Sequence, residues 1–117
     1  MKGIAFDLGT TTGWGAVNGT VMSGVLKLKG GRFEGGGMRF VRFADHVTEL
    51  LNRIKPEWVV FEEVRRHAGT DAAHIYGGLM AVLTGLCERF PGGALPYEGV
   101  PVGTIKKFWT GSGNAPK

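Results

Sequence analysis

The segment that most constrains the fold is Trp58-Val59-Val60-Phe61, a continuous apolar run that ends at Glu62 and Glu63. A strand with apolar residues on both of its sides is typical of a strand buried on both faces of a sheet. Such strands occur where helices cover the sheet. The run therefore predicts an α/β domain.

The N-terminal part of the chain predicts an antiparallel meander of three strands. These strands are expected over Lys2–Leu8, Thr12–Val17 and Thr20–Leu28, with Asn18-Gly19 between the second and the third. Asn-Gly is the strongest two-residue signal for a hairpin. A glycine-rich stretch over residues 30–37 then indicates a loop.

Two helices are predicted, one before and one after the apolar run. Apolar residues recur at helical spacing over Met38–Ile54 and again over Thr70–Arg89, where Thr70 is a candidate N-cap and Asp71 adds favourable charge to the first turn. Ala94–Tyr97 is expected to form a fifth strand, and Val102–Trp109 a short final helix. The resulting order, βββαβαβα, implies a mixed five-stranded sheet with helices on both faces.

The length and charge of the chain limit its class. Its 117 residues fit one domain of ordinary size, and 14 Lys and Arg against 10 Asp and Glu give a net charge of +4. No acidic residue follows Glu98, so Lys106, Lys107 and Lys117 make the C-terminal end cationic. This charge favours nucleic acid or phosphate as a partner, although a solvated helix face would carry the same charges.

The cysteine content and the apolar segments indicate a cytoplasmic protein with no membrane partner. Cys87 is the single cysteine, so neither an internal disulfide nor a cysteine-rich zinc site is available. The N-terminus reaches Asp7 before a secretory signal is completed, and no apolar run is long enough to cross a membrane.

Acidic residues end two of the predicted strands. Asp7 closes the first strand, and Glu62-Glu63 closes the apolar run. If these strands are parallel neighbours about 4.8 Å apart, Asp7 and one glutamate can share a hard cation. Alternation does not decide between Glu62 and Glu63, because both sides of the strand are apolar. The alternative is that Asp7 supports the following turn and that both glutamates are surface strand ends.

Three segments carry a resemblance to a known family: residues 4–9 with 12–15, residues 59–64, and residues 105–117, which read IAFDLG with TGWG, VVFEEV, and IKKFWTGSGNAPK. They resemble the RuvC family of Holliday-junction resolvases, which belongs to the RNase H-like nucleases. The segments stand in the family's order, and the last is the most specific. The resemblance implies one RNase H-like nuclease domain over residues 1–117. It also implies a homodimeric, Mg²⁺-dependent endonuclease of branched DNA, with Mn²⁺ able to substitute.

The resemblance also assigns roles to individual residues. Asp7 matches the family's first metal carboxylate, and Glu62, rather than Glu63, matches the second. Lys106 matches a lysine near the scissile strand, and Lys117 matches the basic residue that closes the family's Gly-x-Gly-x-x-x-Lys segment, so both are expected to act in catalysis. Phosphate contacts are expected from Arg65, Arg66, Lys106, Lys107 and Lys117.

The chain departs from the family pattern in two respects. The family takes its remaining carboxylates from a helix that follows the position of Lys117, so we expect these 117 residues to lack that catalytic helix and half of the metal ligands. Arg65-Arg66-His67 also stands where the family often has an aromatic wedge. Arginine and histidine suit phosphate contacts better than unstacking of bases, which favours DNA binding over a strict preference for junctions.

Two other functions fit parts of the sequence. A non-catalytic DNA-binding dimer would keep the same scaffold without the chemistry. The segment Asp7-Leu8-Gly9-Thr10-Thr11 also resembles the first phosphate loop of the actin, heat-shock chaperone and sugar-kinase ATPases. Those ATPases are built from two such domains, and this chain offers no second phosphate loop.

Small residues recur at every fourth position of the second predicted helix, at Ala73, Gly77, Ala81 and Gly85. Such a strip lets another element approach closely. In a symmetric dimer the strip would meet its own copy about a two-fold axis. The alternative is a helix that is docked only on its own sheet.

Overall fold

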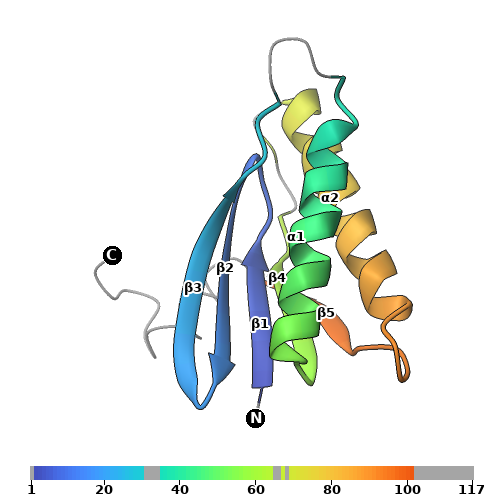
Figure 1. Ribbon diagram of the computed structural model, residues 1–117. Coiled ribbons are helices and arrows are strands. Elements are labelled where there is room, and N and C mark those ends of the chain that lie inside the picture. Colours follow the sequence, from blue (N-terminus) through green and yellow to red (C-terminus); the bar gives the residue numbers. More distant parts are fainter. Residues whose placement is uncertain (1, 31–34, 65–66, 68, 102–117) are drawn as a thin grey trace.

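The computed structural model describes residues 2–30, 35–64, 67 and 69–101, which form a sheet with a helical layer on one side (Figure 1). The elements are β1 (Lys2–Asp7), β2 (Thr11–Asn18), β3 (Thr20–Lys27), α1 (Met38–Ile54), β4 (Trp58–Glu62), α2 (Thr70–Glu88) and β5 (Tyr97–Val100). The strand order in the sheet is β3-β2-β1-β4-β5. The predicted mixed five-stranded α/β sheet is confirmed.

The N-terminal meander forms as predicted. β1 pairs antiparallel with β2, and β2 pairs antiparallel with β3 up to the pair Asn18↔Thr20. Between these two residues Gly19 has a φ of 78°, a left-handed conformation that glycine adopts without steric cost. The Asn-Gly signal therefore marks the turn correctly.

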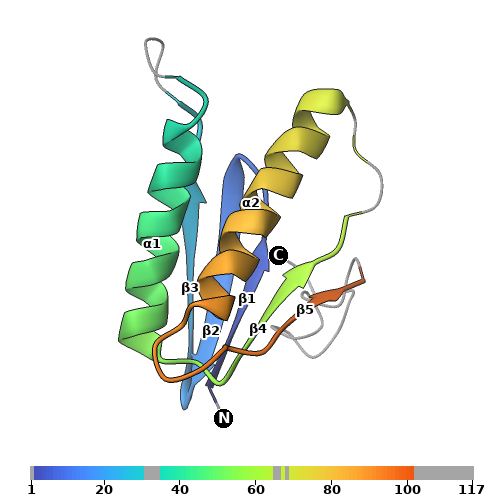
Figure 2. The ribbon, with the colours of Figure 1, turned by 90° about the vertical axis from the view of Figure 1, so that its right-hand side faces the viewer.

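The described helices lie on the same face of the sheet, as Figure 2 shows. β4 is parallel to β1, and β5 is parallel to β4. Crossovers between parallel strands are almost always right-handed, and the crossovers through α1 and α2 both move in the same direction along the sheet. Both described helices consequently cover one face, and the helix expected on the other face stays a prediction. The final helix expected over Val102–Trp109 lies outside the described residues.

Several predicted boundaries shift, and two of the shifts, at the start of β5 and at the N-cap of α2, have a clear physical cause. The fifth strand begins at Tyr97 rather than Ala94, because the N–H of Leu95 donates to the carbonyl of Cys87 (2.9 Å) and Pro96 has no N–H for a strand ladder. The N-cap of α2 is Gly69 rather than Thr70. The carbonyl of Gly69 accepts from the N–H of Ala73 (3.2 Å), so Thr70 is already helical.

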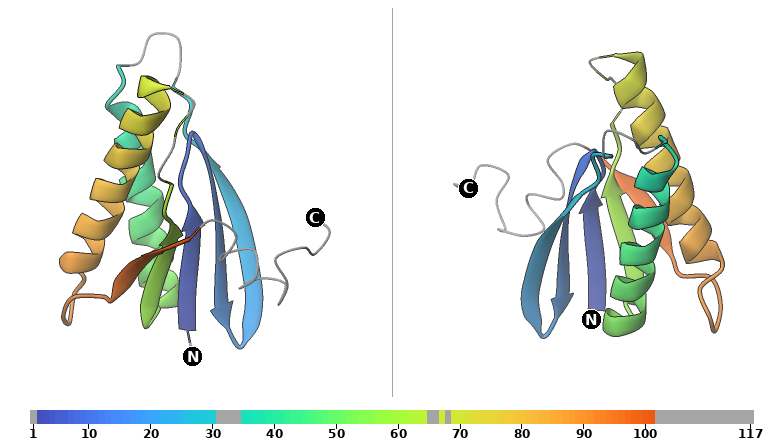
Figure 3. Two further views of the ribbon diagram at one scale, coloured as in Figure 1. Left: turned by 180° about the vertical axis from the view of Figure 1, so that it is seen from behind. Right: turned by 45° about the horizontal axis from the view of Figure 1, so that its top comes forward.

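The core fills the space between the sheet and the helices, which lie as two layers in both views of Figure 3. The rings of Phe6 in β1 and Phe43 in α1 meet edge to face, with their centroids 6.4 Å apart. Leu79 and Leu83 of α2 are fully buried in the same core. A Cβ on Gly78 of α2 would overlap the ring of Phe40, so this glycine is where the two helices approach closely.

The opposite face of the sheet carries the alternate residues. Here β1 contributes Gly3, Ala5 and Asp7, and β4 contributes Trp58, Val60 and Glu62. The indole of Trp58 lies over Gly3, where a Cβ would overlap it. On this second face β1 contributes small residues before Asp7, and the acidic residues of both strands stand at one end.

In the part of the chain that the structure describes, no helix has the length and apolar character needed to span a bilayer.

Candidate metal and nucleic-acid site

Asp7 and Glu62 end two neighbouring parallel strands. In the register of β1 and β4, Phe6 is paired with Phe61, and Asp7 and Glu62 are the next residue of each strand. Both follow a residue that points into the core, so both belong to the face opposite the helices. The predicted pair of carboxylates is therefore brought together at the carboxyl edge of the sheet.

The environment of Glu62 reflects this proximity. The pKa of its carboxyl is raised above the ordinary value, first by desolvation and second by the negative charge of Asp7. Two carboxylates that repel each other in this way are favourable ligands for a shared divalent cation, because the cation offsets the repulsion. Oxygen-only ligands of this kind suit Mg²⁺ or Mn²⁺.

Glu63 lies on the other side of the strand. Its Oε2 comes within 3.1 Å of the position that a Cβ on Gly99 would occupy, beside the ring of Phe61. Its backbone N–H donates to the carbonyl of Val100 (2.7 Å), which keeps the chain attached to β5 beyond the end of β4. The choice between the two glutamates, which alternation alone leaves open, falls on Glu62 as the neighbour of Asp7.

The turn after Asp7 is fixed by a buried threonine. The hydroxyl of Thr12 donates to the carbonyl of Gly9 (2.7 Å) and accepts from the N–H of the same residue (3.2 Å). The N–H of Leu28 donates to the carbonyl of Thr10 (2.7 Å), which ties the turn to the end of β3. Asp7 thus stands at the end of a strand whose following turn is held from two sides.

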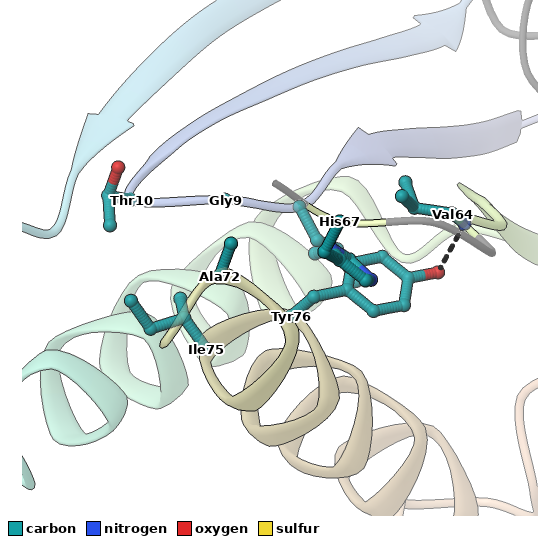
Figure 4. A pocket seen from close by; sticks show the side chains of 8 residues that line it. Gly9, Thr10, Val64, His67, Ala72, Ile75 and Tyr76 are labelled. Carbon is teal, nitrogen blue, oxygen red and sulfur yellow. Dashed lines mark hydrogen bonds between the residues drawn. The ribbon is translucent and has the colours of Figure 1, made fainter. Parts of the chain in front are cut away.

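The end of β4 is fixed by a tyrosine of α2. The hydroxyl of Tyr76 donates to the carbonyl of Glu62 (2.7 Å) and accepts from the N–H of Val64 (3.2 Å), the second of which is drawn in Figure 4. The ring of Tyr76 belongs to the core, and sequence reasoning does not find the role of its hydroxyl. The available signal is that a buried tyrosine hydroxyl needs a polar partner.

A cleft of about 400 Å³ opens at the same edge of the sheet (Figure 4). It lies between the β1–β2 turn, the β4–α2 connection and the first turns of α2. The ring of His67 lies against that of Tyr76, with centroids 5.1 Å apart and planes tilted by 47°. The lining residues are Leu8, Gly9, Thr10, Val64, His67, Ala72, Ile75 and Tyr76.

The other predicted site residues cannot be added to this geometry. Arg65, Arg66, Lys106, Lys107 and Lys117 lie outside the described residues. Within residues 2–30, 35–64, 67 and 69–101, no group of three or more His, Cys, Asp or Glu side chains is arranged to hold a metal ion. The described part of the site is the pair of Asp7 and Glu62.

The two glycines of the small-residue strip of α2 do not serve close packing against the rest of the described chain. Among the described residues, a Cβ built on Gly77 or Gly85 would meet no atom of another element within 4 Å. Ala81 is exposed and Ala73 is half-buried. The close approach between α1 and α2 uses Gly78, one position away from the predicted strip.

Comparison with known proteins gives structural matches only. No family model matches the chain. No curated protein matches it either. Among solved structures, Thermus thermophilus RuvC in complex with a Holliday junction substrate matches with a TM-score of 0.77 and 23% identity, over 100% of this chain and 73% of that one. A second Thermus thermophilus RuvC structure matches with a TM-score of 0.64 and 26% identity, over 100% of this chain and 74% of that one. The chain thus has the RNase H-like fold of RuvC, and the resemblance in its sequence is confirmed.

Proposed function

We propose that this protein is a metal-dependent DNA endonuclease of the RuvC type, which hydrolyses phosphodiester bonds in branched DNA such as Holliday junctions. The observation that carries the proposal is the position of Asp7 and Glu62, side by side at the ends of β1 and β4. The fold supports it, because a RuvC with this fold has been solved with a Holliday junction. The proposal treats residues 1–117 as one nuclease domain and locates it in the cytoplasm.

Asp7 and Glu62 would hold Mg²⁺, or Mn²⁺ in its place. The fit rests on the donor set, since two neighbouring carboxylates offer hard oxygen ligands and a negative charge that a divalent ion offsets. When bound, such ions activate water for attack and stabilise charge on the phosphate oxygens. The two strand ends serve this chemistry by keeping both carboxylates fixed on the same face of the sheet.

The basic residues would bind the DNA backbone. We assign Lys106 and Lys117 to the phosphate at the cleavage site. Arg65, Arg66 and Lys107 are assigned to neighbouring phosphates, because these contacts position the DNA without reading its sequence. Their effect should appear as weaker binding at higher salt.

The active unit would be a homodimer that is formed along α2. The support is that no other element of the described chain packs against Gly77 or Gly85, so a second copy could approach there. Gly77→Leu should then lower the solution mass from dimer to monomer without unfolding the chain. A wild type that stays monomeric at high concentration contradicts the dimer. A folded Gly77→Leu protein that remains dimeric contradicts this strip as the interface.

The nuclease proposal is tested with Asp7→Asn. The wild-type full-length protein should nick a four-way junction in Mg²⁺. Asp7→Asn in that protein should lose more than about 100-fold of this rate, because the metal contributes several kcal/mol to the transition state. Junction binding in a gel-shift assay without metal should persist. Asp45→Asn, the same change at an exposed position of α1, is the matched control and should cleave normally.

The outcome also separates the second candidate function. Unchanged nicking by Asp7→Asn would contradict the assignment of Asp7 to the catalytic site. A wild type that binds junctions but never nicks them would favour a non-catalytic DNA-binding protein. That reading has its own support, since only two carboxylates meet at the site within the described part of the chain.

A further inference from the structure

The hydroxyl of Tyr76 bridges the backbone on both sides of Glu63. It donates to the carbonyl of Glu62 (2.7 Å), the last residue of β4, and it accepts from the N–H of Val64 (3.2 Å). The N–H of Glu63 between them donates to the carbonyl of Val100 in β5 (2.7 Å). Three consecutive residues are thus held by hydrogen bonds at the point where the strand ends.

This attachment fixes the backbone that carries Glu62. The Glu62 side chain is half-buried and stands beside the negative charge of Asp7. Like charges repel, so a loosely held strand end would let the two carboxylates move apart. The hydrogen bond to the Glu62 carbonyl opposes that movement, because it fixes the peptide from which the side chain projects.

Tyr76 is itself rigidly held. Its side chain is only 7% exposed, and it belongs to the core that also contains Leu79 and Leu83 of α2. Its ring also contacts that of His67 (Figure 4). A phenylalanine would fill the same space in the core, so the hydroxyl contributes only its two hydrogen bonds to the strand end.

We propose that Tyr76 is a positioning residue for the metal site, which holds Glu62 in the orientation that lets it share a divalent ion with Asp7. The proposal rests on the proposed nuclease function. Tyr76 acts through the backbone of Glu62 and Val64, to which its hydroxyl is hydrogen-bonded. Partners of this kind, which orient a metal ligand, typically change metal affinity or activity by about 10- to 100-fold when they are removed.

The test uses Tyr76→Phe, with Tyr97→Phe as its matched control. The chain has two tyrosines, and the hydroxyl of Tyr97 donates to Glu88 at a partly exposed position at the start of β5. Mn²⁺ binding is measured by electron paramagnetic resonance, and the rate of junction nicking is measured against Mg²⁺ concentration. Tyr76→Phe should weaken Mn²⁺ binding and raise the half-saturating Mg²⁺ concentration by about tenfold. Junction affinity without metal should stay unchanged, and Tyr97→Phe should match the wild type.

A third variant separates positioning from a general loss of stability. Leu83→Val removes one methylene from the core face of α2 without touching the end of β4. It should lower the melting temperature and leave the Mg²⁺ dependence unchanged. If Tyr76→Phe shifts the Mg²⁺ dependence no more than Leu83→Val does, the positioning role is overturned.

The two proposals fail in different ways. A wild type that neither binds Mn²⁺ nor nicks DNA contradicts the nuclease and, with it, the positioning role. If the wild type is active, Asp7→Asn is inactive, and Tyr76→Phe keeps the metal dependence of Tyr97→Phe, the nuclease stands and the positioning role is wrong.

Discussion

The two faces of the sheet use the same strands for different purposes. On the helix side, β1 and β4 present Ile4, Phe6, Val59 and Phe61, all of which are buried in the core. On the other side, the same strands present Gly3, Ala5 and Val60 before they end in Asp7 and Glu62. Consecutive residues of a strand point to opposite faces, so the residue after a core residue can belong to the candidate site.

The difference shows how the site depends on the core. The helix side holds the strands in register through large, interlocking side chains, so the carboxylates at the strand ends are placed by packing on the opposite face. Tyr76 is the direct connection, since its ring belongs to the core and its hydroxyl bonds to the backbone of Glu62. The core thus orients the site without adding a side chain to it.

The largest effect is expected from Phe43→Ala on the helix side. Phe43 is fully buried and meets the ring of Phe6, so its truncation removes apolar contacts and leaves a cavity. The free energy of unfolding should fall by about 3–5 kcal/mol, as measured by urea denaturation.

The matched change on the other face is Val25→Ala. Val25 is paired with Gly13, and its side chain is 59% exposed, so the free energy of unfolding should change by less than about 0.5 kcal/mol. A large loss of unfolding free energy in Val25→Ala would show that this part of the face is covered. It would contradict the expected difference between the two faces.

A second prediction concerns Gly3, on the face of the sheet opposite α1 and α2. A Cβ on Gly3 would overlap the indole of Trp58, so Gly3→Ala must displace this ring. The free energy of unfolding should fall by about 1–3 kcal/mol, with a change in tryptophan fluorescence.

Gly13→Ala is the control for this change. Its Cβ would lie 4.0 Å from that of Asp7, an ordinary contact, so stability should stay within about 0.5 kcal/mol of the wild type. If Gly3→Ala and Gly13→Ala lower the free energy of unfolding equally, overlap with Trp58 does not explain the effect. The face opposite α1 and α2 would then tolerate no added side-chain volume at either position.

The elements of the fold could be predicted because local signals agree with the tertiary structure. Met38–Ile54 forms a helix with the predicted bounds, and Asn18-Gly19 marks the hairpin. Local signals say less where tertiary contacts decide. The element order alone does not say which face α1 and α2 cover, because the direction of the two crossovers selects that face.

The site shows the same limit. Asp7 could be found from its place at a strand end. Without the family resemblance, however, the residues alone do not decide between Glu62 and Glu63, and the register of β4 with β1 is needed. The strip of small residues on α2 suggests close packing, yet it is Gly78, outside the strip, that meets α1. Periodicity places a residue on a helix, but it does not say which neighbour the residue meets.

The smallest expected effect concerns the cost of the acidic pair itself. Desolvation and the charge of Asp7 raise the pKa of Glu62 in the folded protein, so ionised Glu62 destabilises the fold at neutral pH. Glu62→Gln removes this charge and should stabilise the metal-free protein, by no more than about 0.5 kcal/mol because solvent screens the half-buried pair. The measurement is thermal unfolding of both proteins at pH 7 in the presence of a chelator.

The pH dependence of the stability difference between Glu62→Gln and the wild type distinguishes an electrostatic cause from a change in packing. Because the pKa of Glu62 is raised on folding, the wild type gains stability relative to Glu62→Gln as the pH falls through the folded pKa toward the ordinary value of 4.5, where Glu62 becomes neutral. The advantage of Glu62→Gln should therefore shrink with acidification, and Mn²⁺ at neutral pH should reverse it by stabilising the wild type more. If the advantage of Glu62→Gln is the same at pH 7 and pH 4.5, the charge of Glu62 does not destabilise the fold.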